Sequence, residues 1–265
     1  MIIDKWNPED YHKNSSEQQK WGLELLDKIA FAGNERVIDL GCGDGKITAK
    51  IASLVPLGSV LGIDRSEEMI HFARVHYSQE NFPNLVFTVQ DMRSLSFHEE
   101  FDLAFSNAAL HWVSDHASLL SSITRGLRKG GRIVAQMGGK GNADEILHTL
   151  GAIIKSKKWS PYFASFVVPY TFYDYQEYID LLQKYGLTIK RLECIPKEMS
   201  HQGEGGLAAW IRTTWLPYTR RVPGHLQPEF IREIVDTYIT TRHLDKNGTI
   251  QVEMVRLEFE AVREM

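Results

Sequence analysis

Between residues 34 and 137, short strand-like runs alternate with helix-like runs, and this rhythm is the strongest constraint on the fold. Each strand-like run is rich in Val, Ile, Leu or Phe and is often apolar at consecutive positions, as a strand buried on both faces should be. Such alternation predicts an α/β fold with a doubly wound, mostly parallel sheet. The predicted strands are Arg36 to Leu40, Ser59 to Asp64, Leu85 to Gln90, Asp102 to Asn107 and Arg132 to Met137.

Three runs with helical spacing separate these strands, namely Lys46 to Leu54, Glu67 to Tyr77 and Ala117 to Leu127. We expect Lys129-Gly130-Gly131 to close the last of them. Glycine readily adopts the left-handed conformation that ends many helices, and a cation suits the negative end of the helix dipole.

Beyond Gly138 the pattern becomes helix-rich and is interrupted by prolines, which predicts a helical cap built on the sheet edge. We therefore divide the chain into N-terminal lid helices (1–30), an α/β core (31–140) and a helical cap interleaved with the last sheet strands (141–265).

Two segments of the last part have clear patterns of their own. Tyr175 to Tyr185 is amphipathic and is followed by Gly186, which predicts a helix, and Leu187 to Cys194 follows as a strand. Ile250 to Ala261 is partly alternating, which favours a mainly extended strand, antiparallel at the sheet edge, with a helix as the alternative.

Composition excludes several classes of protein. The formal net charge of −4 and the pI of about 6.2 give no general attraction to phosphate backbones, so no nucleic-acid partner is expected. No apolar run approaches the roughly 20 residues that span a bilayer, and the first residues do not resemble a signal peptide, so we expect a cytoplasmic protein without a membrane partner. The two cysteines are too few for a disulfide framework or a zinc site, and no metal is expected.

The sharpest local motif is a predicted buried strand that runs directly into a loop with three glycines, Asp39-Leu40-Gly41-Cys42-Gly43-Asp44-Gly45. Glycine lets a backbone turn tightly and approach a ligand, and the following helix offers free N–H groups. A nicotinamide-binding loop of the Gly-x-Gly-x-x-Gly type would need glycine where Lys46 stands. A tight turn without a ligand is the structural alternative.

Acidic residues follow the next two predicted strands. Asp64 ends the second strand, about twenty residues past the glycines, where a carboxylate accepts hydrogen bonds from ribose hydroxyls. Its alternative role is a cap for the helix that follows. Asp91 and Met92 come after the third strand, where a carboxylate would accept from an adenine amino group and an apolar side chain would cover the ring. Open α/β sheets bind ligands at these carboxyl ends.

Together with the segment Ser106-Asn107-Ala108-Ala109-Leu110-His111-Trp112-Val113, these motifs resemble those of class I S-adenosylmethionine-dependent methyltransferases. Within that superfamily the chain is most similar to trans-aconitate methyltransferases and to the malonyl-carrier-protein O-methyltransferases. The resemblance implies a Rossmann-like, seven-stranded sheet that binds S-adenosylmethionine without a metal. It also implies the cofactor-contacting residues, which are Gln18, Asp39, Gly41, Cys42, Gly43, Asp64, Arg65, Met69, Asp91, Met92 and Asn107.

On the acceptor side, Tyr11 and His111 are the candidate catalytic residues. The segment from Trp6 to Gln19 resembles the lid helix of the same methyltransferases, in which Tyr11 and Gln18 would close over the methionine end of the cofactor. A helix entry capped by Ser15 or Ser16 is the simpler interpretation of that segment. His111 would contact the acceptor or act as a base, or would only pack beside Trp112.

Aromatic and guanidinium groups gather in one short stretch of the predicted cap. A planar guanidinium suits a carboxylate, and aromatic walls would bury an acyl group or a ring; a solvated helix face is the alternative. The expected acceptor-binding residues are Trp112, Trp210, Arg212, Arg220 and Arg221.

The leading hypothesis is O-methylation of a small-molecule or carrier-bound carboxylate. The alternatives are a methyltransferase for amines or phenols, a cofactor-binding subunit without turnover, and a nicotinamide oxidoreductase. We expect a monomer or weak dimer.

Overall fold

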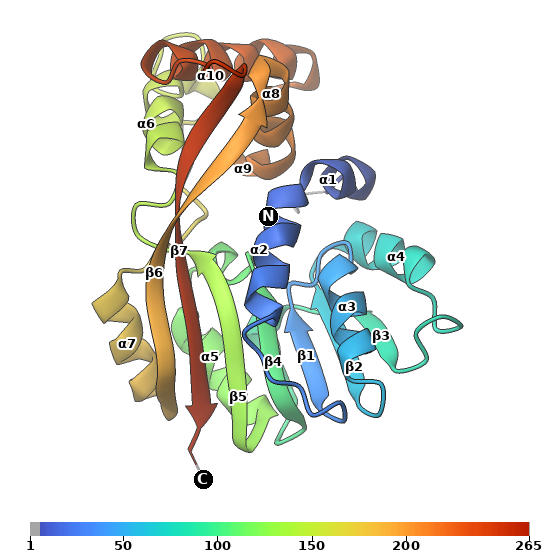
Figure 1. Ribbon diagram of the computed structural model, residues 1–265. Coiled ribbons are helices and arrows are strands. Elements are labelled where there is room, and N and C mark those ends of the chain that lie inside the picture. The colour runs from blue at the N-terminus through green and yellow to red at the C-terminus, as the bar shows by residue number, and fades with distance from the viewer. Residues whose placement is uncertain (1–5, 265) are drawn as a thin grey trace. The chain divides into compact units, whose positions relative to one another are not determined.

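The computed structural model describes residues 6–264, which form two compact units (Figure 1). Of these residues, the sheet unit comprises 6–140, 170–195 and 256–264, and the helical unit comprises 141–169 and 196–255. The predicted division after residue 140 coincides with a unit boundary, whereas the two later segments of the sheet unit lie inside the region predicted as cap. The first five residues of the predicted lid lie outside the described residues.

The sheet has seven strands in the order β3-β2-β1-β4-β5-β7-β6. Strands β1 to β5 pair in parallel, and β7 pairs antiparallel to β5. This confirms the predicted doubly wound, mostly parallel sheet. The strands are β1 (Arg36–Leu40), β2 (Ser59–Asp64), β3 (Leu85–Val89), β4 (Phe101–Asn107), β5 (Leu127–Gly138), β6 (Leu187–Gln202) and β7 (Thr249–Arg263).

Neighbouring strand residues point to opposite faces of the sheet and build two apolar cores. On one face Val37, Phe87 and Phe105 pack against α2 (Ser16–Leu26), α3 (Lys46–Leu54) and α4 (Glu67–His76). On the other face Ile38 and its neighbours pack against α5 (His116–Gly126) and α7 (Tyr175–Lys184). Burial on both faces explains the consecutive apolar positions in the strands.

One prediction at the end of the α/β repeat is wrong. Lys129-Gly130-Gly131 does not end a helix, because α5 stops at Gly126 and these residues belong to β5. Gly130 does have a left-handed backbone (φ 76°), but it marks an irregularity in the pairing of β4 with β5. A glycine pair suits a strand bulge as well as a helix end, and only the pairing partner decides between them.

The last strand is extended and antiparallel as predicted, but its place at the edge is wrong. β7 lies between β5 and β6, so β6 is the edge strand. The unit boundaries at 195/196 and 255/256 fall within these two strands.

The N-terminal segment forms α1 (Pro8–Asn14) and α2 within the sheet unit. Ser15 occupies the N-cap position of α2 but its side chain makes no capping hydrogen bond, so the alternative of a helix capped by Ser15 is not observed. Short 3₁₀ turns occur at η1 (Met92–Ser94) and η2 (Leu110–Trp112). None of the helices between residues 6 and 264 is long and apolar enough to span a membrane.

The helical unit consists of helices around an aromatic core. Trp159 packs edge-on against Phe230, and Arg242 donates to Glu145 from Nε at 2.7 Å and from Nη2 at 2.6 Å. Its elements are α6 (Asp144–Ile153), η3 (Ser160–Tyr162), α8 (Gly203–Thr214), α9 (Leu216–Thr219), η4 (Gly224–Leu226), α10 (Gln227–Thr241) and the adjoining ends of β6 and β7.

Candidate functional site

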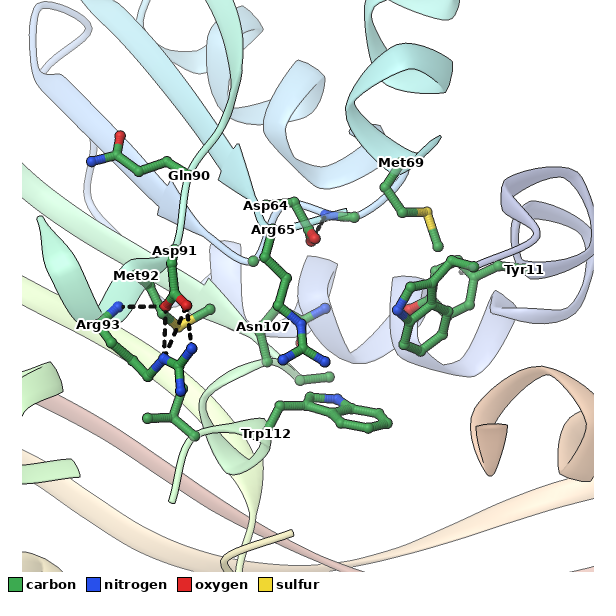
Figure 2. Close-up of a pocket in the computed structure, with 16 residues that line it drawn as sticks. Tyr11, Asp64, Arg65, Met69, Gln90, Asp91, Met92, Arg93, Asn107 and Trp112 are labelled. Atoms are coloured by element: carbon green, nitrogen blue, oxygen red, sulfur yellow. Dashed lines mark hydrogen bonds and ion pairs between the residues drawn. The ribbon is translucent and has the colours of Figure 1, made fainter. Parts of the chain in front are cut away.

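An open cleft of about 770 Å³ lies at the carboxyl ends of β1 to β4, and a smaller cavity of about 420 Å³ adjoins it on the side of α2. Figure 2 shows the side chains around the larger cleft. Every cofactor-contacting residue predicted above lines one or both spaces. The larger cleft is lined by Trp6, Tyr11, Gly41, Gly43, Asp64, Arg65, Met69, Gln90, Asp91, Met92, Arg93, Asn107, Ala108, Ala109, Trp112 and Val113. The smaller cavity is lined by Tyr11, Ser15, Gln18, Gln19, Asp39, Gly41, Cys42, Gly43, Asp44, Lys46, Ile47 and Asn107.

The glycine loop forms the floor shared by the two spaces. Gly41, Gly43 and Gly45 all have left-handed backbones, with φ of 77°, 54° and 84°. A Cβ atom on Gly41 would lie 2.3 Å from the Cβ of Ala109, whereas one on Gly43 would meet nothing closer than a Tyr11 ring carbon at 4.0 Å. Gly41 therefore permits close packing, and Gly43 keeps space open in front of Tyr11.

Asp64 holds the loop from the end of β2. Its Oδ2 accepts a hydrogen bond from the Gly43 N–H at 3.0 Å, and its Oδ1 accepts from the Ser66 N–H at 2.9 Å. Burial raises the pKa of this carboxyl above its ordinary value. The side chain of Ser66, and not that of Asp64, caps α4 by accepting from the Met69 N–H. Each Asp64 oxygen retains a lone pair for a further donor.

Asp39 is the buried acid of the smaller cavity. Only 2% of the residue is exposed, and Thr48 Oγ1 donates to its Oδ2 at 2.7 Å. Burial raises the pKa of Asp39 to about 7, against the smaller lowering effect of the Thr48 hydrogen bond. A cationic ligand group placed beside Asp39 would favour its ionised form.

Asn107 lies at the end of β4 and lines both spaces. Its Nδ2 donates to the Gln18 carbonyl at 3.0 Å, which sets the direction of the amide, and its buried Oδ1 has no hydrogen-bond partner among residues 6–264. A buried acceptor without a partner costs free energy, so this oxygen is suited to a ligand donor. The next residue, Ala108, has a left-handed backbone (φ 56°).

Asp91 follows the end of β3 and lines the larger cleft. Its carboxylate pairs with the guanidinium of Arg93 and accepts from the Arg93 N–H at 2.9 Å (Figure 2). This pairing lowers the pKa of Asp91. The neighbouring Met92 brings its methyl carbon within 3.1 Å of the position that a Cβ on Gly41 would take.

Three aromatic rings cover part of the larger cleft. Trp6 lies edge-on to both Tyr11 and Trp112, with ring centroids 5.5 and 5.6 Å apart. Burial and the negative charges of Asp44 and Asp64 raise the pKa of Tyr11 well above its ordinary value. Tyr11 therefore keeps its proton near neutral pH.

His111 is buried on η2 and lines neither space itself, although the next residue, Trp112, lines the larger cleft. Its Nδ1 accepts from the Gly138 N–H at 3.3 Å, and burial, together with the nearby charge of Arg256, lowers its pKa to about 3. The imidazole is consequently neutral near pH 7 and carries its hydrogen on Nε2. In this state it is a hydrogen-bond donor with no free basic nitrogen.

The predicted acceptor-binding residues divide between the two units. Trp112 belongs to the sheet unit and lines the larger cleft. Trp210 is buried in the helical unit against His201, with ring centroids 4.9 Å apart, and Arg221 lies over the ring of Phe166. The contact of the four helical-unit residues, Trp210, Arg212, Arg220 and Arg221, with an acceptor stays a prediction.

Sequence reasoning missed several lining residues and one buried cation. Trp6, Ala109 and Val113 line the cleft; they lie in the segments quoted above for the resemblance but were not predicted as site residues. Arg256 was missed as well, although the sequence pattern could have indicated it. It follows Val252 and Met254 at alternate positions of the strand, where an inward-facing apolar residue is expected.

Comparison with known proteins decides the family. The family model described as "Methyltransferase domain" matches residues 32–170. A trans-aconitate 2-methyltransferase from Enterobacter sp. (strain 638) is 30% identical over 262 residues, which cover 98% of each chain. The chain belongs to the class I S-adenosylmethionine-dependent methyltransferases. S-adenosylmethionine is accordingly the methyl donor that this family implies.

Solved structures agree with the methyltransferase fold. The YcgJ protein of Bacillus subtilis matches with a TM-score of 0.63 and 18% identity, over 93% of this chain and 99% of that one. The [4+2]-cyclase SpnF matches with a TM-score of 0.60 and 14% identity, over 93% of this methyltransferase and 80% of the cyclase. One fold thus carries different reactions, and the acceptor must be argued from the site.

Proposed function

We propose that this methyltransferase esterifies a carboxylate of a small organic acid, free or carrier-bound, with the methyl group of S-adenosylmethionine. The observation that carries the proposal is the state of the two candidate catalytic residues. His111 has its Nδ1 occupied and a pKa of about 3, and Tyr11 keeps its proton, so both are donors and poor bases near pH 7. A carboxylate is ionised at that pH and needs no base, whereas a phenol or an ammonium group must first lose a proton.

The likeness to trans-aconitate 2-methyltransferase supports the same acceptor class, because it extends over 98% of both chains. That relative's name describes methylation of a tricarboxylic acid. A small acid, with trans-aconitate as the first compound to test, is therefore the acceptor we propose.

The residues of the cleft fit the proposed cofactor. Gly43 leaves open space in front of Tyr11, and the partnerless Oδ1 of Asn107 suits a ligand donor such as an ammonium group. Asp64 has lone pairs for ribose hydroxyls, and Met92 offers an apolar surface for adenine. Asp91 would accept from the adenine amino group while staying paired with Arg93. Gln18, Asp39, Gly41, Cys42, Arg65 and Met69 would complete the contacts.

The protein's part in the reaction is positioning and the exclusion of water. S-adenosylmethionine, when bound, supplies a methyl carbon whose bond to sulfur breaks as an acceptor oxygen attacks in line, the electron pair leaving on sulfur. Asn107 would hold the methionine end, and the Trp6, Tyr11 and Trp112 rings would shield the reacting groups from water. His111 would donate its Nε2–H to the acceptor.

The deciding experiment is transfer of labelled methyl from S-adenosylmethionine to matched panels of carboxylic acids, amines and phenols, followed by mild alkaline hydrolysis. We expect alkali-labile label on an acid. Alkali-stable label on an amine or phenol would replace the proposal with nitrogen or phenol methylation. Tight binding of S-adenosylhomocysteine with no turnover on any panel would instead indicate a cofactor-binding subunit.

A further inference from the structure

Arg256 is a buried cation without a counterion. It is 4% exposed, and no hydrogen bond or ion pair joins its guanidinium to another of residues 6–264. Its Nε is completely buried and lacks a partner. The guanidinium carbon Cζ lies over the Trp21 ring, 4.4 Å from the ring centroid. Burial lowers the pKa of Arg256 to about 10, so the side chain still carries its charge at neutral pH.

The same strand shows how this fold pairs a buried charge elsewhere. Glu258 lies two residues away on β7 and is also 4% exposed. It accepts from Lys28 at 2.6 Å and from Arg191. An uncompensated buried charge costs several kcal/mol, so the contrast marks Arg256 as a group that lacks its partner in this structure.

Arg256 lies on β7, opposite the carboxyl end of β5. It pairs in register with Gly138 at the carboxyl end of β5, and the Gly138 N–H donates to His111. Glu258 pairs with Gln136, whose Nε2 donates to the Trp21 carbonyl on α2. Because strand residues alternate between faces, Arg256 shares the α2 face with Gln136.

The charge of Arg256 affects the pKa of both candidate catalytic residues. It helps to lower the pKa of His111 and acts to lower that of Tyr11. Tyr11 lines the larger cleft, and Arg256 belongs to the same unit, so the cation acts electrostatically on a residue of the cleft.

We propose that Arg256 binds a carboxylate of the acceptor and is the specificity-determining residue for acids. The inference rests on the proposed function and adds to it a residue outside every recognised motif. A guanidinium presents its N–H groups as a planar fork that matches a carboxylate, and charge-assisted hydrogen bonds in a buried site are strong. An acid would supply the missing counterion, whereas a neutral amide of the same shape would leave Arg256 unpaired.

The test is calorimetric binding of propane-1,2,3-tricarboxylate and of its triamide, each with saturating S-adenosylhomocysteine. We expect Arg256→Gln to weaken tricarboxylate binding about ten- to hundredfold, and Arg256→Lys to weaken it less. Triamide binding and S-adenosylhomocysteine affinity should stay as in the wild type. Arg132→Gln is the matched control, because Arg132 lies on β5 with Glu260 as its partner at 3.2 Å, and it should change neither ligand's affinity.

Wild-type tricarboxylate affinity in Arg256→Gln would overturn the assignment, as would an equal loss for the triamide or for S-adenosylhomocysteine. If Arg256→Gln does not fold, NMR of the wild type provides a second test. The arginine Nε–H resonance that is present in the wild type and absent from Arg256→Lys belongs to Arg256. That resonance should shift on adding tricarboxylate, and an unmoved resonance contradicts the proposal. Ester formation by the wild type is measured separately. If the wild type forms an ester but Arg256→Gln binds tricarboxylate as the wild type does, only the role of Arg256 is rejected. If tricarboxylate binding depends on Arg256 but no ester forms, only the proposed function is rejected.

Discussion

The Gly43 N–H donates a 3.0 Å hydrogen bond to Asp64 Oδ2, which ties the loop after β1 to the end of β2. The two residues lie 21 positions apart in the sequence, and neighbouring parallel strands bring them together. One carboxylate thereby shapes the loop and faces the cleft at the same time.

Replacing Asp64 with alanine should weaken S-adenosylhomocysteine binding by one to two orders of magnitude. The change removes an acceptor for ribose hydroxyls and the anchor of Gly43, and hydrogen bonds to a charged group contribute roughly 1.5 to 3 kcal/mol. Titration calorimetry measures the dissociation constant. Glu67→Gln, an exposed acid at the start of α4, serves as control and should bind normally. An unchanged constant for Asp64→Ala would remove the ribose assignment.

Alanine at Gly41 and at Gly43 should have different consequences, although both glycines have positive φ. At Gly41 the new Cβ would collide with Ala109 at 2.3 Å, so we expect a loss of several kcal/mol in unfolding free energy. At Gly43 the Cβ meets no atom within less than 4.0 Å, so only the backbone cost of about 1 to 2 kcal/mol remains, together with weaker cofactor binding. Chemical unfolding of both variants tests whether Gly41→Ala loses more unfolding free energy than Gly43→Ala. Equal losses of unfolding free energy would contradict the prediction.

Ala108→Gly should leave the protein as stable as the wild type or stabilise it by up to about 1 kcal/mol. Ala108 has φ 56°, which costs an alanine roughly 1 to 2 kcal/mol, and glycine removes that cost while adding about 0.5 to 1 kcal/mol of entropy loss. Urea unfolding gives the difference directly. A clear destabilisation would mean that the Ala108 methyl group packs more favourably than its backbone is strained.

Stability should depend on pH through Asp39, whose pKa is raised to about 7. Between its unfolded pKa near 4 and about 7, the folded state holds a proton that the unfolded state has released. The wild type should therefore lose stability as pH rises through this window, by about 2 to 4 kcal/mol relative to Asp39→Asn, which cannot ionise. Unfolding free energies of both proteins from pH 5 to 8 test this, and parallel curves would show that Asp39 has an ordinary pKa.

His111→Gln should lower turnover at saturating substrates by less than tenfold on a carboxylate acceptor. Glutamine keeps a donor and an acceptor, and a base would contribute about 10²- to 10⁴-fold if the reaction needed one. Steady-state turnover with the best acid from the acceptor panel provides the measurement. A loss of a hundredfold or more would reinstate His111 as a base.

Local patterns predicted the α/β half because its elements obey local rules. The helix over Lys46–Leu54 and the strands that end in Leu40 and Asp64 were placed to the residue, since the burial of each depends on its own apolar spacing. Gly130 was misassigned because its backbone conformation suits both a helix end and a bulge. The order of β7 and β6 was missed because strand neighbours are chosen by long-range pairing that no local pattern encodes.

For the site, the sequence by itself determined which residues stand at strand ends, because glycines and acids placed there have a local chemical reason. Only the tertiary structure decided the protonation and the hydrogen-bond partners of the buried polar groups. Burial raises the pKa of Asp39 and of Tyr11, a backbone N–H occupies Nδ1 of His111, and strand pairing brings Arg256 opposite Gly138. Protonation and charge compensation depend on what surrounds a group in space, and those surroundings come from segments far apart in the sequence.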